Sequence, residues 1–286
     1  MHHPWPPLKK SIDQGLSLFM VLDGHGGEWA ADYVASHLGV CVAAQNGYSS
    51  TAKAAAKEAA LLKGFLYCDQ RCLVEQETNG EKSGTTACAV LIDHSDIYVA
   101  NCGDTRAILS RAGQAIELSH DHKPTDPEEK ARIEAAGGRV PEGSAYAELG
   151  DKGLATSRAF GNRLFKQNPT KSEAAQIIIP HPYQSRTSRQ FGVDEFVIIA
   201  TDGLWNVCSH QYAVEFVRKR LLSNQDVEDI AHKLTQHALD RKTNDNCSCV
   251  IVTFPVAFRG ELLAQVPLAI QVQPAAGAAA SSADAK

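Results

Sequence analysis

The chain has 286 residues, of which 44% are hydrophobic and 21% are charged, a balance typical of a globular protein rather than a disordered or fibrous one. Its formal net charge is -5, so no overall basic field exists to attract a nucleic-acid backbone or an anionic membrane. No linker-like segment divides its middle. We therefore expect a single domain over residues 1–258, with neither nucleic acid nor a membrane as a partner.

Eight cysteines are spread through the chain, and a chain of this size does not need disulfides to be stable. Cys68 with Cys72, and Cys247 with Cys249, could be metal pairs, but neither is accompanied by a second pair at zinc-finger spacing. We expect free, buried thiols in a reducing compartment, and hence a cytoplasmic or nuclear protein.

The N-terminal segment imitates a secretory signal, because Lys9 and Lys10 precede an apolar run over 15–22. That run is too short to span a membrane, and it continues into the Gly-rich sequence at 23–27 without a small-residue cleavage site. The pattern predicts a buried strand and a turn, followed by a helix over 28–42 with apolar residues at helical spacing.

Further elements follow in blocks of helices and strands. Composition and periodicity predict helices at 51–77, 211–222 and 227–240. The sequence Thr125-Asp126-Pro127-Glu128 predicts a capping box that opens another helix. Strand-like runs lie at 86–93, 97–101, 107–110, 177–179, 195–200 and 248–254, and the first three predict an antiparallel meander. Such blocks favour an α+β domain whose antiparallel sheets are covered by helices.

Two segments do not fit regular elements. Residues 141–176 are mostly polar and rich in glycine, which predicts a surface insertion. From about 259 to 286 the chain consists largely of Ala, Ser, Gln and Pro, which predicts a disordered tail.

Acidic residues stand at the ends of several predicted strands, namely Asp23, Asp104, Asp202 and Asp245. Any one of them alone could be a turn former that bonds its own backbone. Carboxylates that converge repel one another unless cations neutralise them, so together they indicate hard divalent ions. Glycine follows Asp23 and Asp202 directly and would let the backbone approach a ligand.

The spelling and order of seven segments resemble the metal-dependent protein phosphatases of type 2C. They are VLDGHGG at 21–27, SGTTA at 83–87, NCGDTR at 101–106, DHKP at 121–124, LATSRAFGN at 154–162, ATDGLWNV at 200–207 and DNCSCVIV at 245–252. The resemblance implies a four-layer α-β-β-α sandwich of two antiparallel sheets flanked by helices. It also identifies 141–176 with the variable flap of the family, where we would look for substrate specificity.

The same resemblance implies two Mg2+ or Mn2+ ions and no other cofactor. Asp23 would bridge both ions, the Gly24 carbonyl would help to hold one, and Asp202 with Asp245 would hold the other. A hydroxide bridging the ions would attack phosphorus, and His25 would protonate the departing serine or threonine oxygen. Alternatively, His25 merely orients a metal-bound water.

Two positions depart from the family pattern at a third, looser ion site and near the flap. Asp104 is present for the third ion, but the second position is Asn206, and an amide is a weaker, neutral ligand. Asn162 stands where many relatives have Asp.

A further departure lies before Asp23. Relatives carry an Arg that grips phosphate and an acidic pair on an upstream strand, whereas the 22 residues before Asp23 contain no Arg and Asp13 as their one acid. Lys9 or Lys10 would lack the bidentate fork of Arg. Truncation of the sequence or loss of activity would both explain the difference, and either would leave an exposed sheet edge.

Two functions follow as hypotheses. The first is a serine/threonine protein phosphatase in signal transduction, with phosphoproteins as substrates and kinases as further partners. The alternative is a pseudophosphatase, a regulatory module that binds a phosphoprotein or a kinase without turning it over. We expect a monomer in either case.

Overall fold

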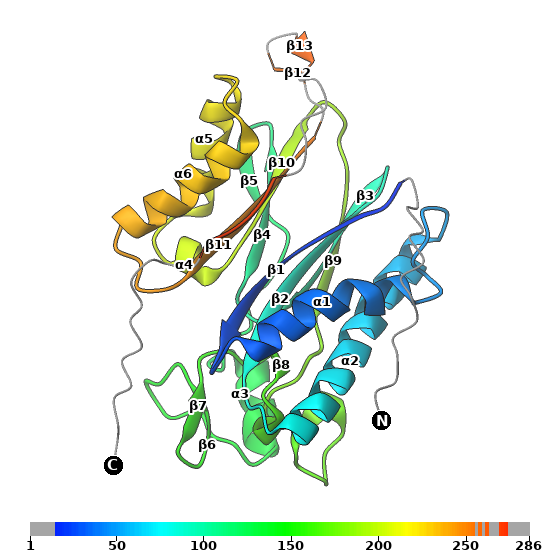
Figure 1. Ribbon diagram of the computed structural model, residues 1–286, viewed down its shortest axis with the longest axis vertical. Helices are drawn as coiled ribbons and strands as arrows, with labels where there is room; N and C mark the ends of the chain where they lie inside the picture. Colours follow the sequence, from blue (N-terminus) through cyan, green and yellow to red (C-terminus); the bar gives the residue numbers. More distant parts are fainter. Residues whose placement is uncertain (1–14, 255–256, 259–260, 263–268, 274–286) are drawn as a thin grey trace. The chain divides into compact units, whose positions relative to one another are not determined.

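The computed structural model describes residues 15–254, 257–258, 261–262 and 269–273, and the chain forms two compact units. Unit 1 comprises Met1–Gly103 and Asp121–Arg189, and unit 2 comprises Asp104–His120 and Gln190–Lys286 (Figure 1). The single domain over 1–258 stays a prediction.

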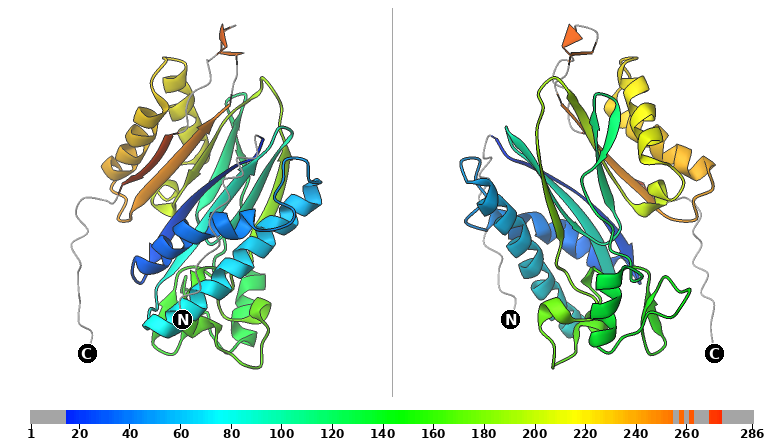
Figure 2. Two further views of the ribbon diagram at one scale, coloured as in Figure 1. Left: turned by 45° about the vertical axis from the view of Figure 1, so that its right-hand side comes forward. Right: turned by 180° about the vertical axis from the view of Figure 1, so that it is seen from behind.

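Unit 1 is built on an antiparallel sheet with the strand order β1-β2-β3-β9, to which β8 adds by pairing with β2. Its strands are β1 (Ser17–His25), β2 (Gly84–Ile92), β3 (Asp96–Cys102), β8 (Phe160–Gly161) and β9 (Tyr183–Ser188). Helices α1 (Trp29–Ala43) and α2 (Ala54–Asn79) lie together on one face of this sheet (Figures 1 and 2). Leu38 and Phe65 of the helices pack with Leu91 and Tyr98 of the sheet in one buried cluster.

The two helices approach closely at Gly64. A Cβ atom at this position would lie 2.5 Å from Val42 Cγ2 and 2.7 Å from Val42 Cα. Real Cβ atoms essentially never come this close to another heavy atom, so a side chain at position 64 would clash with Val42. Glycine therefore allows the two helices to approach each other.

The rest of unit 1 contains α3 (Pro127–Ala135), the hairpin of β6 (Ala147–Leu149) and β7 (Lys152–Leu154), and two short 3-10 helices, η1 (Arg163–Lys166) and η2 (Glu173–Ala175). Ile133, Phe165 and Ile178 pack together beneath them. Two buried polar groups complete this region: the ion pair Lys166–Asp69, and the carboxylate of Glu129 on α3.

Unit 2 is built on a second antiparallel sheet with the order β14-β11-β10-β4-β5. Its strands are β4 (Arg106–Arg111), β5 (Gln114–Glu117), β10 (Asp194–Ala200), β11 (Cys247–Thr253) and β14 (Ala269–Gln273), and a separate hairpin joins β12 (Ala257–Phe258) to β13 (Glu261–Leu262). The helices are α4 (Asp202–Trp205), α5 (His210–Leu221) and α6 (Val227–Asp240). Ile230 and Leu234 of α6 pack with Ile198 of β10 and Ile251 of β11.

The predicted α+β class is confirmed, since both sheets are antiparallel and carry helices. The long helices are confirmed within a few residues, and α6 has the predicted bounds. All eight cysteines are free and buried, as predicted.

Several predicted elements were wrong. The meander ends after two strands, because β4 pairs with β10 and β5 rather than with β3. The run 177–179 makes one isolated bridge, Arg158 with Ile179, because its buried side chains serve a loop cluster rather than a sheet. The capping box does not form. Asp126 is the N-cap but makes no side-chain cap bond, and its Oδ2 accepts instead from the Lys123 N–H. Pro127 begins the helix, as predicted.

The polar segment 141–176 contains the β6–β7 hairpin, and the tail predicted to be disordered contains β13 and β14. β14 pairs with β11 over five residues, and its sequence AIQVQ alternates β-branched residues within an Ala- and Gln-rich composition. The remainder of that tail, like residues 1–14 with Lys9, Lys10 and Asp13, lies outside the described residues. In the described part of the sheet β1 is an end strand.

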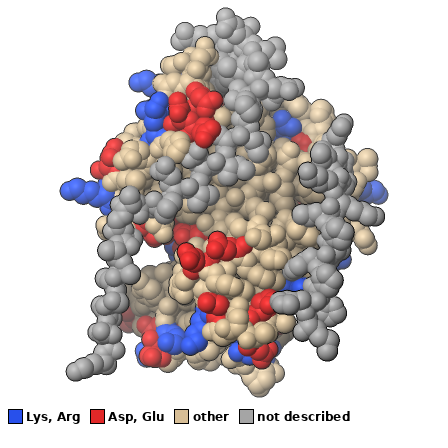
Figure 3. Space-filling view, viewed as in Figure 1, with Lys and Arg blue, Asp and Glu red and all other residues tan. Residues whose placement is uncertain are grey.

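Lys and Arg side chains are interspersed with Asp and Glu side chains on the face shown in Figure 3. Within the described ranges, none of the helices is both long and apolar enough to cross a membrane.

Candidate active site

The first part of the candidate site is the C-terminal end of strand β1 in unit 1. β1 continues through Asp23, Gly24 and His25, which pair with Thr86, Thr85 and Gly84 of β2. The Asp23 N–H also donates to Thr86 Oγ1 at 3.2 Å. The sequence predicted a turn from Asp23 onwards, whereas the structure holds these three residues in the ladder, which fixes their backbone.

The glycines around Asp23 permit a sharp reversal from β1 into α1. Gly26 and Gly27 have φ angles of 68° and 128°, which residues with a side chain rarely adopt. A Cβ atom on Gly24 would lie 3.0 Å from the Cβ of Ala31 on α1. Gly24, whose carbonyl is a predicted metal ligand, is exposed. Its backbone is crowded on the side that faces Ala31.

His25 has a partner that sequence reasoning did not connect with it. The ring Nε2 lies 2.7 Å from Oδ1 of Asn162, the residue directly after β8. Because a side-chain amide oxygen can only accept, this contact places the ring proton on Nε2. The sequence signal was available, since Asn162 closes the family-like segment at 154–162.

Asn162 itself is firmly held. It is buried, adopts the left-handed conformation with φ 52°, and its N–H donates to the Ser83 carbonyl at 3.0 Å. A Cβ on Gly84 would lie 1.9 Å from its Oδ1, so the amide fills the space that the missing side chain leaves. Next to it, the Gly161 N–H donates to the buried carboxylate of Asp69 at 2.7 Å.

The second part of the candidate site lies in unit 2, where β10 ends and β11 begins. Asp202 opens α4 directly after β10, and Asp245 precedes β11. A Cβ on Gly203 would lie 2.2 Å from the Asn246 carbonyl oxygen and 3.5 Å from the Cβ of Asp245. The glycine after Asp202 therefore brings the two acidic residues together, because any side chain there would push the β11 loop away.

Thr201 joins the same two segments. Its N–H donates to the Ser248 carbonyl and its hydroxyl donates to the Asn246 carbonyl, at 3.1 and 3.2 Å. The N–H of Asn246 is in turn bonded to Asp245 Oδ1 at 2.8 Å. These hydrogen bonds tie the exposed loop that carries Asp245 to the segment that precedes Asp202.

The two residues expected at the third ion have different surroundings. Asp104 is buried before β4, while Asn206 is exposed after α4 and donates from Nδ2 to Asp202 Oδ2 at 3.2 Å. Asn206 thus acts here as a donor to a predicted metal ligand. An Asp at the same place would repel that carboxylate in the absence of an ion.

The donor types fit a hard divalent cation. Asp202 and Asp245 in unit 2, and Asp23 with the Gly24 carbonyl in unit 1, all offer oxygen, which Mg2+ and Mn2+ prefer. Among the residues that the structure describes, no group of three or more His, Cys, Asp or Glu could hold a metal by itself. The close approach at Gly203 nevertheless places Asp245 beside the residue that follows Asp202.

Solved structures with a similar fold include a phosphatase. A serine-threonine phosphatase 2C from Toxoplasma gondii superposes with a TM-score of 0.72 at 19% identity, covering 84% of this chain and 85% of that one. The fold of this chain is therefore that of the 2C-type phosphatases.

Sequence comparison gives the family. The family model described as Protein phosphatase 2C matches residues 1–247. A probable protein phosphatase 2C of Caenorhabditis elegans is 39% identical over 79% of this chain and 61% of its own length, and human protein phosphatase 1A is 33% identical over 84% and 63%. The chain belongs to the protein phosphatase 2C family, and it spans less than two thirds of the length of these relatives.

Proposed function

We propose that this chain is a metal-dependent protein phosphatase that hydrolyses phosphoserine and phosphothreonine. The observation that supports it most is the close approach of Asp245 to Gly203, the residue after Asp202, in unit 2, together with the strand pairing that holds Asp23 and His25 in unit 1. Asp23 and His25 lie in a strand ladder, and Asp202 and Asp245 directly follow and precede strands; groups on or next to rigid elements are held more precisely than groups on long loops.

In this proposal Asp23, the Gly24 carbonyl, Asp202 and Asp245 hold two ions, Mg2+ or Mn2+. Such ions supply positive charge that activates water and neutralises the phosphate. Protonated His25 gives its Nδ1 proton to the serine or threonine oxygen as the bond between that oxygen and phosphorus breaks, while Nε2–H stays bonded to Asn162. Asn162 holds the imidazole by its 2.7 Å contact and so limits the orientations from which the proton is given.

The test is hydrolysis of a phosphothreonine peptide at millimolar Mn2+. His25→Gln should lower kcat by about 100-fold to 10,000-fold, the usual contribution of a general acid, and Asp202→Asn should lower kcat/KM at least as far. Asp229→Asn, an exposed residue of α6, is the matched control and should leave both unchanged. Full activity of Asp202→Asn, or no hydrolysis by the unmodified chain, would show that the proposal is wrong.

Inactivity combined with binding of the phosphopeptide would instead support the pseudophosphatase. The sequence feature that favours this alternative is the lack of an Arg and an acidic pair before Asp23. Isothermal titration with Mn2+ separates the two readings, since two tightly bound ions per chain fit the enzyme only.

The partners and location belong to the same proposal. Phosphoproteins are the substrates and kinases are candidate partners, because a phosphatase acts on what kinases produce. The eight buried, free thiols support a reducing compartment, the cytoplasm or the nucleus. Gel filtration with light scattering tests the proposed monomer.

A further inference from the structure

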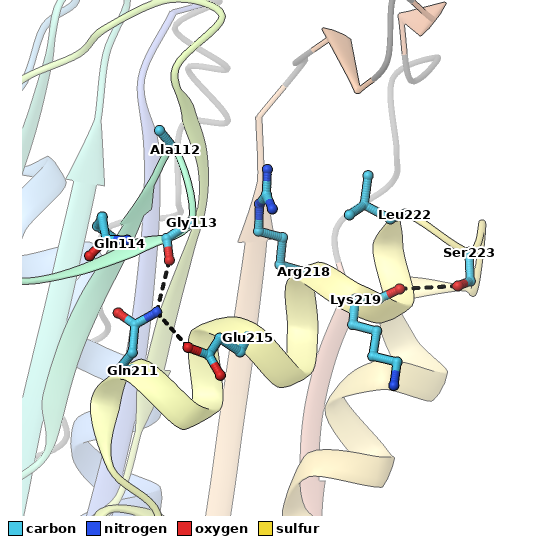
Figure 4. Close-up of a pocket in the computed structure, with 9 residues that line it drawn as sticks. All are labelled: Ala112, Gly113, Gln114, Gln211, Glu215, Arg218, Lys219, Leu222 and Ser223. Carbon is cyan, nitrogen blue, oxygen red and sulfur yellow. Dashed lines mark hydrogen bonds between the residues drawn. The ribbon is translucent and has the colours of Figure 1, made fainter.

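Unit 2 carries two adjoining hollows beside the C-terminal half of α5. The first, of about 590 Å³, lies between α5 and the turn that joins β4 to β5 (Figure 4). The second, of about 240 Å³, lies between the end of α5 and α6. Lys219 and Ser223 line both, so the two hollows form one elongated surface, here termed the α5 groove.

The α5 groove is predominantly basic. Lys219, Arg220 and Lys233 line the smaller hollow, and no acidic residue does. Glu215, Arg218 and Lys219 line the larger hollow, and Arg218 pairs with Glu195 at 2.8 Å. The lining thus carries an excess of positive charge at one end.

The cations are held in place to different degrees. The Arg220 guanidinium stacks over the Phe216 ring at 3.3 Å and donates to the Phe216 carbonyl, and Lys233 Nζ donates to Gln225 Oε1 at 3.1 Å. Neither contact supplies a negative charge. Lys219 is exposed, and in the described part of the chain its ammonium group has no hydrogen-bond or ion-pair partner.

The helix dipole explains part of this pattern only. Cations in the last turn of α5 complement the negative end of its dipole. Lys233, however, lies in the second turn of α6, near the positive end of that helix. Like charges gathered without an acid repel one another, and an anionic partner would relieve that repulsion.

The shape of the α5 groove favours a polypeptide over a small anion. Its larger half offers the exposed Leu222, the turn residue Ala112 and the side chain of Gln114. Strand addition at β5 is blocked, because the Gln211 amide already donates to the Gly113 carbonyl and accepts from the Ala115 N–H, at 2.9 and 3.0 Å. A bound segment would therefore be held by its side chains.

We propose that the α5 groove is a docking site for an acidic segment of a protein partner, with Asp or Glu side chains on Lys219 and Lys233 and an apolar side chain on Leu222. The contact is charge-directed, so it speeds encounter and selects partners rather than providing tight binding. It does not depend on the proposed phosphatase activity.

The test uses the full chain and a fluorescein-labelled twelve-residue peptide of Asp and Glu with one central Leu and no phosphate. Fluorescence anisotropy should show binding that weakens as salt is raised. The double variant Lys219→Glu, Lys233→Glu should weaken binding about tenfold, since each reversal turns an attraction into a repulsion. Both residues are exposed, so circular dichroism should confirm an unchanged fold.

A matched control separates the α5 groove from overall charge. Lys63→Glu with Lys242→Glu alters the net charge equally at two other exposed positions and should keep binding within twofold. The proposal is overturned if both double variants bind equally, if the peptide does not bind at 1 mM, if inorganic phosphate displaces it, or if phosphatidylserine vesicles bind in its place. Because the peptide carries no phosphate, a catalytically inactive chain gives the same reading.

Discussion

The carboxylate of Glu129 is the best place to test the energetics of unit 1. It is buried on α3 and accepts from Ser157 Oγ at 2.5 Å, from Arg158 Nη2 at 2.6 Å and from Arg132 Nη1 at 2.8 Å. Burial alone raises the pKa of Glu129, but the hydrogen bond from Arg158, the charge of Arg132 and the Ser157 hydroxyl together outweigh it and lower the pKa to about 2. Glu129→Gln would leave two cations beside a neutral amide.

The magnitude follows from that pKa. A fall from 4.5 in the unfolded chain to about 2 in the fold corresponds to about 3 kcal/mol at neutral pH, since one pKa unit equals about 1.4 kcal/mol. Because the folded pKa is the lower one, this stabilisation is complete above pH 4.5 and is lost as pH falls towards 2. About half of it should remain at pH 3.

The assay is urea unfolding of both chains by circular dichroism, at several pH values from 7 down to 3. Glu129→Gln should be about 3 kcal/mol less stable at pH 7, and this difference should shrink as the medium becomes acidic. Glu134→Gln removes an exposed pair with Lys130 and should cost less than about 0.5 kcal/mol. A difference below about 1 kcal/mol at pH 7, or one that does not change with pH, would refute the reasoning.

Two further substitutions, one in a buried ion pair and one at a helix–helix contact of unit 1, are tested by the same unfolding assay. Lys166→Met leaves the buried carboxylate of Asp69 without its cation and should destabilise the chain by about 3–5 kcal/mol. Lys130→Met, at the surface, is the control and should have almost no effect. Equal losses in the two variants would show that the buried ion pair does not stabilise unit 1. Gly64→Ala places a methyl group against Val42 and should destabilise by about 1–3 kcal/mol. A gain in stability there would show that the helices separate without cost.

Local signals in the sequence were enough for most of the elements. The apolar stripe of Ile230 and Leu234 predicted α6 because that face is buried in the core. Strand pairing was harder, since β3 and β4 have similar compositions and only long-range contacts decide which sheet each joins. β9, with the sequence YQSRTS, has a polar, partly exposed surface and gave no strand signal at all.

The candidate site, like the fold, could be predicted from the sequence only in part. Asp23, Asp202 and Asp245 could be found because each follows or precedes an apolar run, and strand ends are visible in one sequence. Asn162 could be singled out as the end of the segment at 154–162, but its contact with His25 could not be predicted, because only the paired strands β2 and β8 bring the two segments together. The α5 groove could not be predicted either, since it depends on how the consecutive helices α5 and α6 and the turn between β4 and β5 pack in space.

The amide of Asn162 fills the space that a side chain on residue 84 would need, although the two positions belong to different motifs. Substitutions at them should therefore be epistatic: a methyl group at 84 is compatible only with a smaller residue at 162, and that smaller residue would leave His25 without its acceptor. In the family at large these two positions should vary together, and an alteration at either one should be judged only with the other in view.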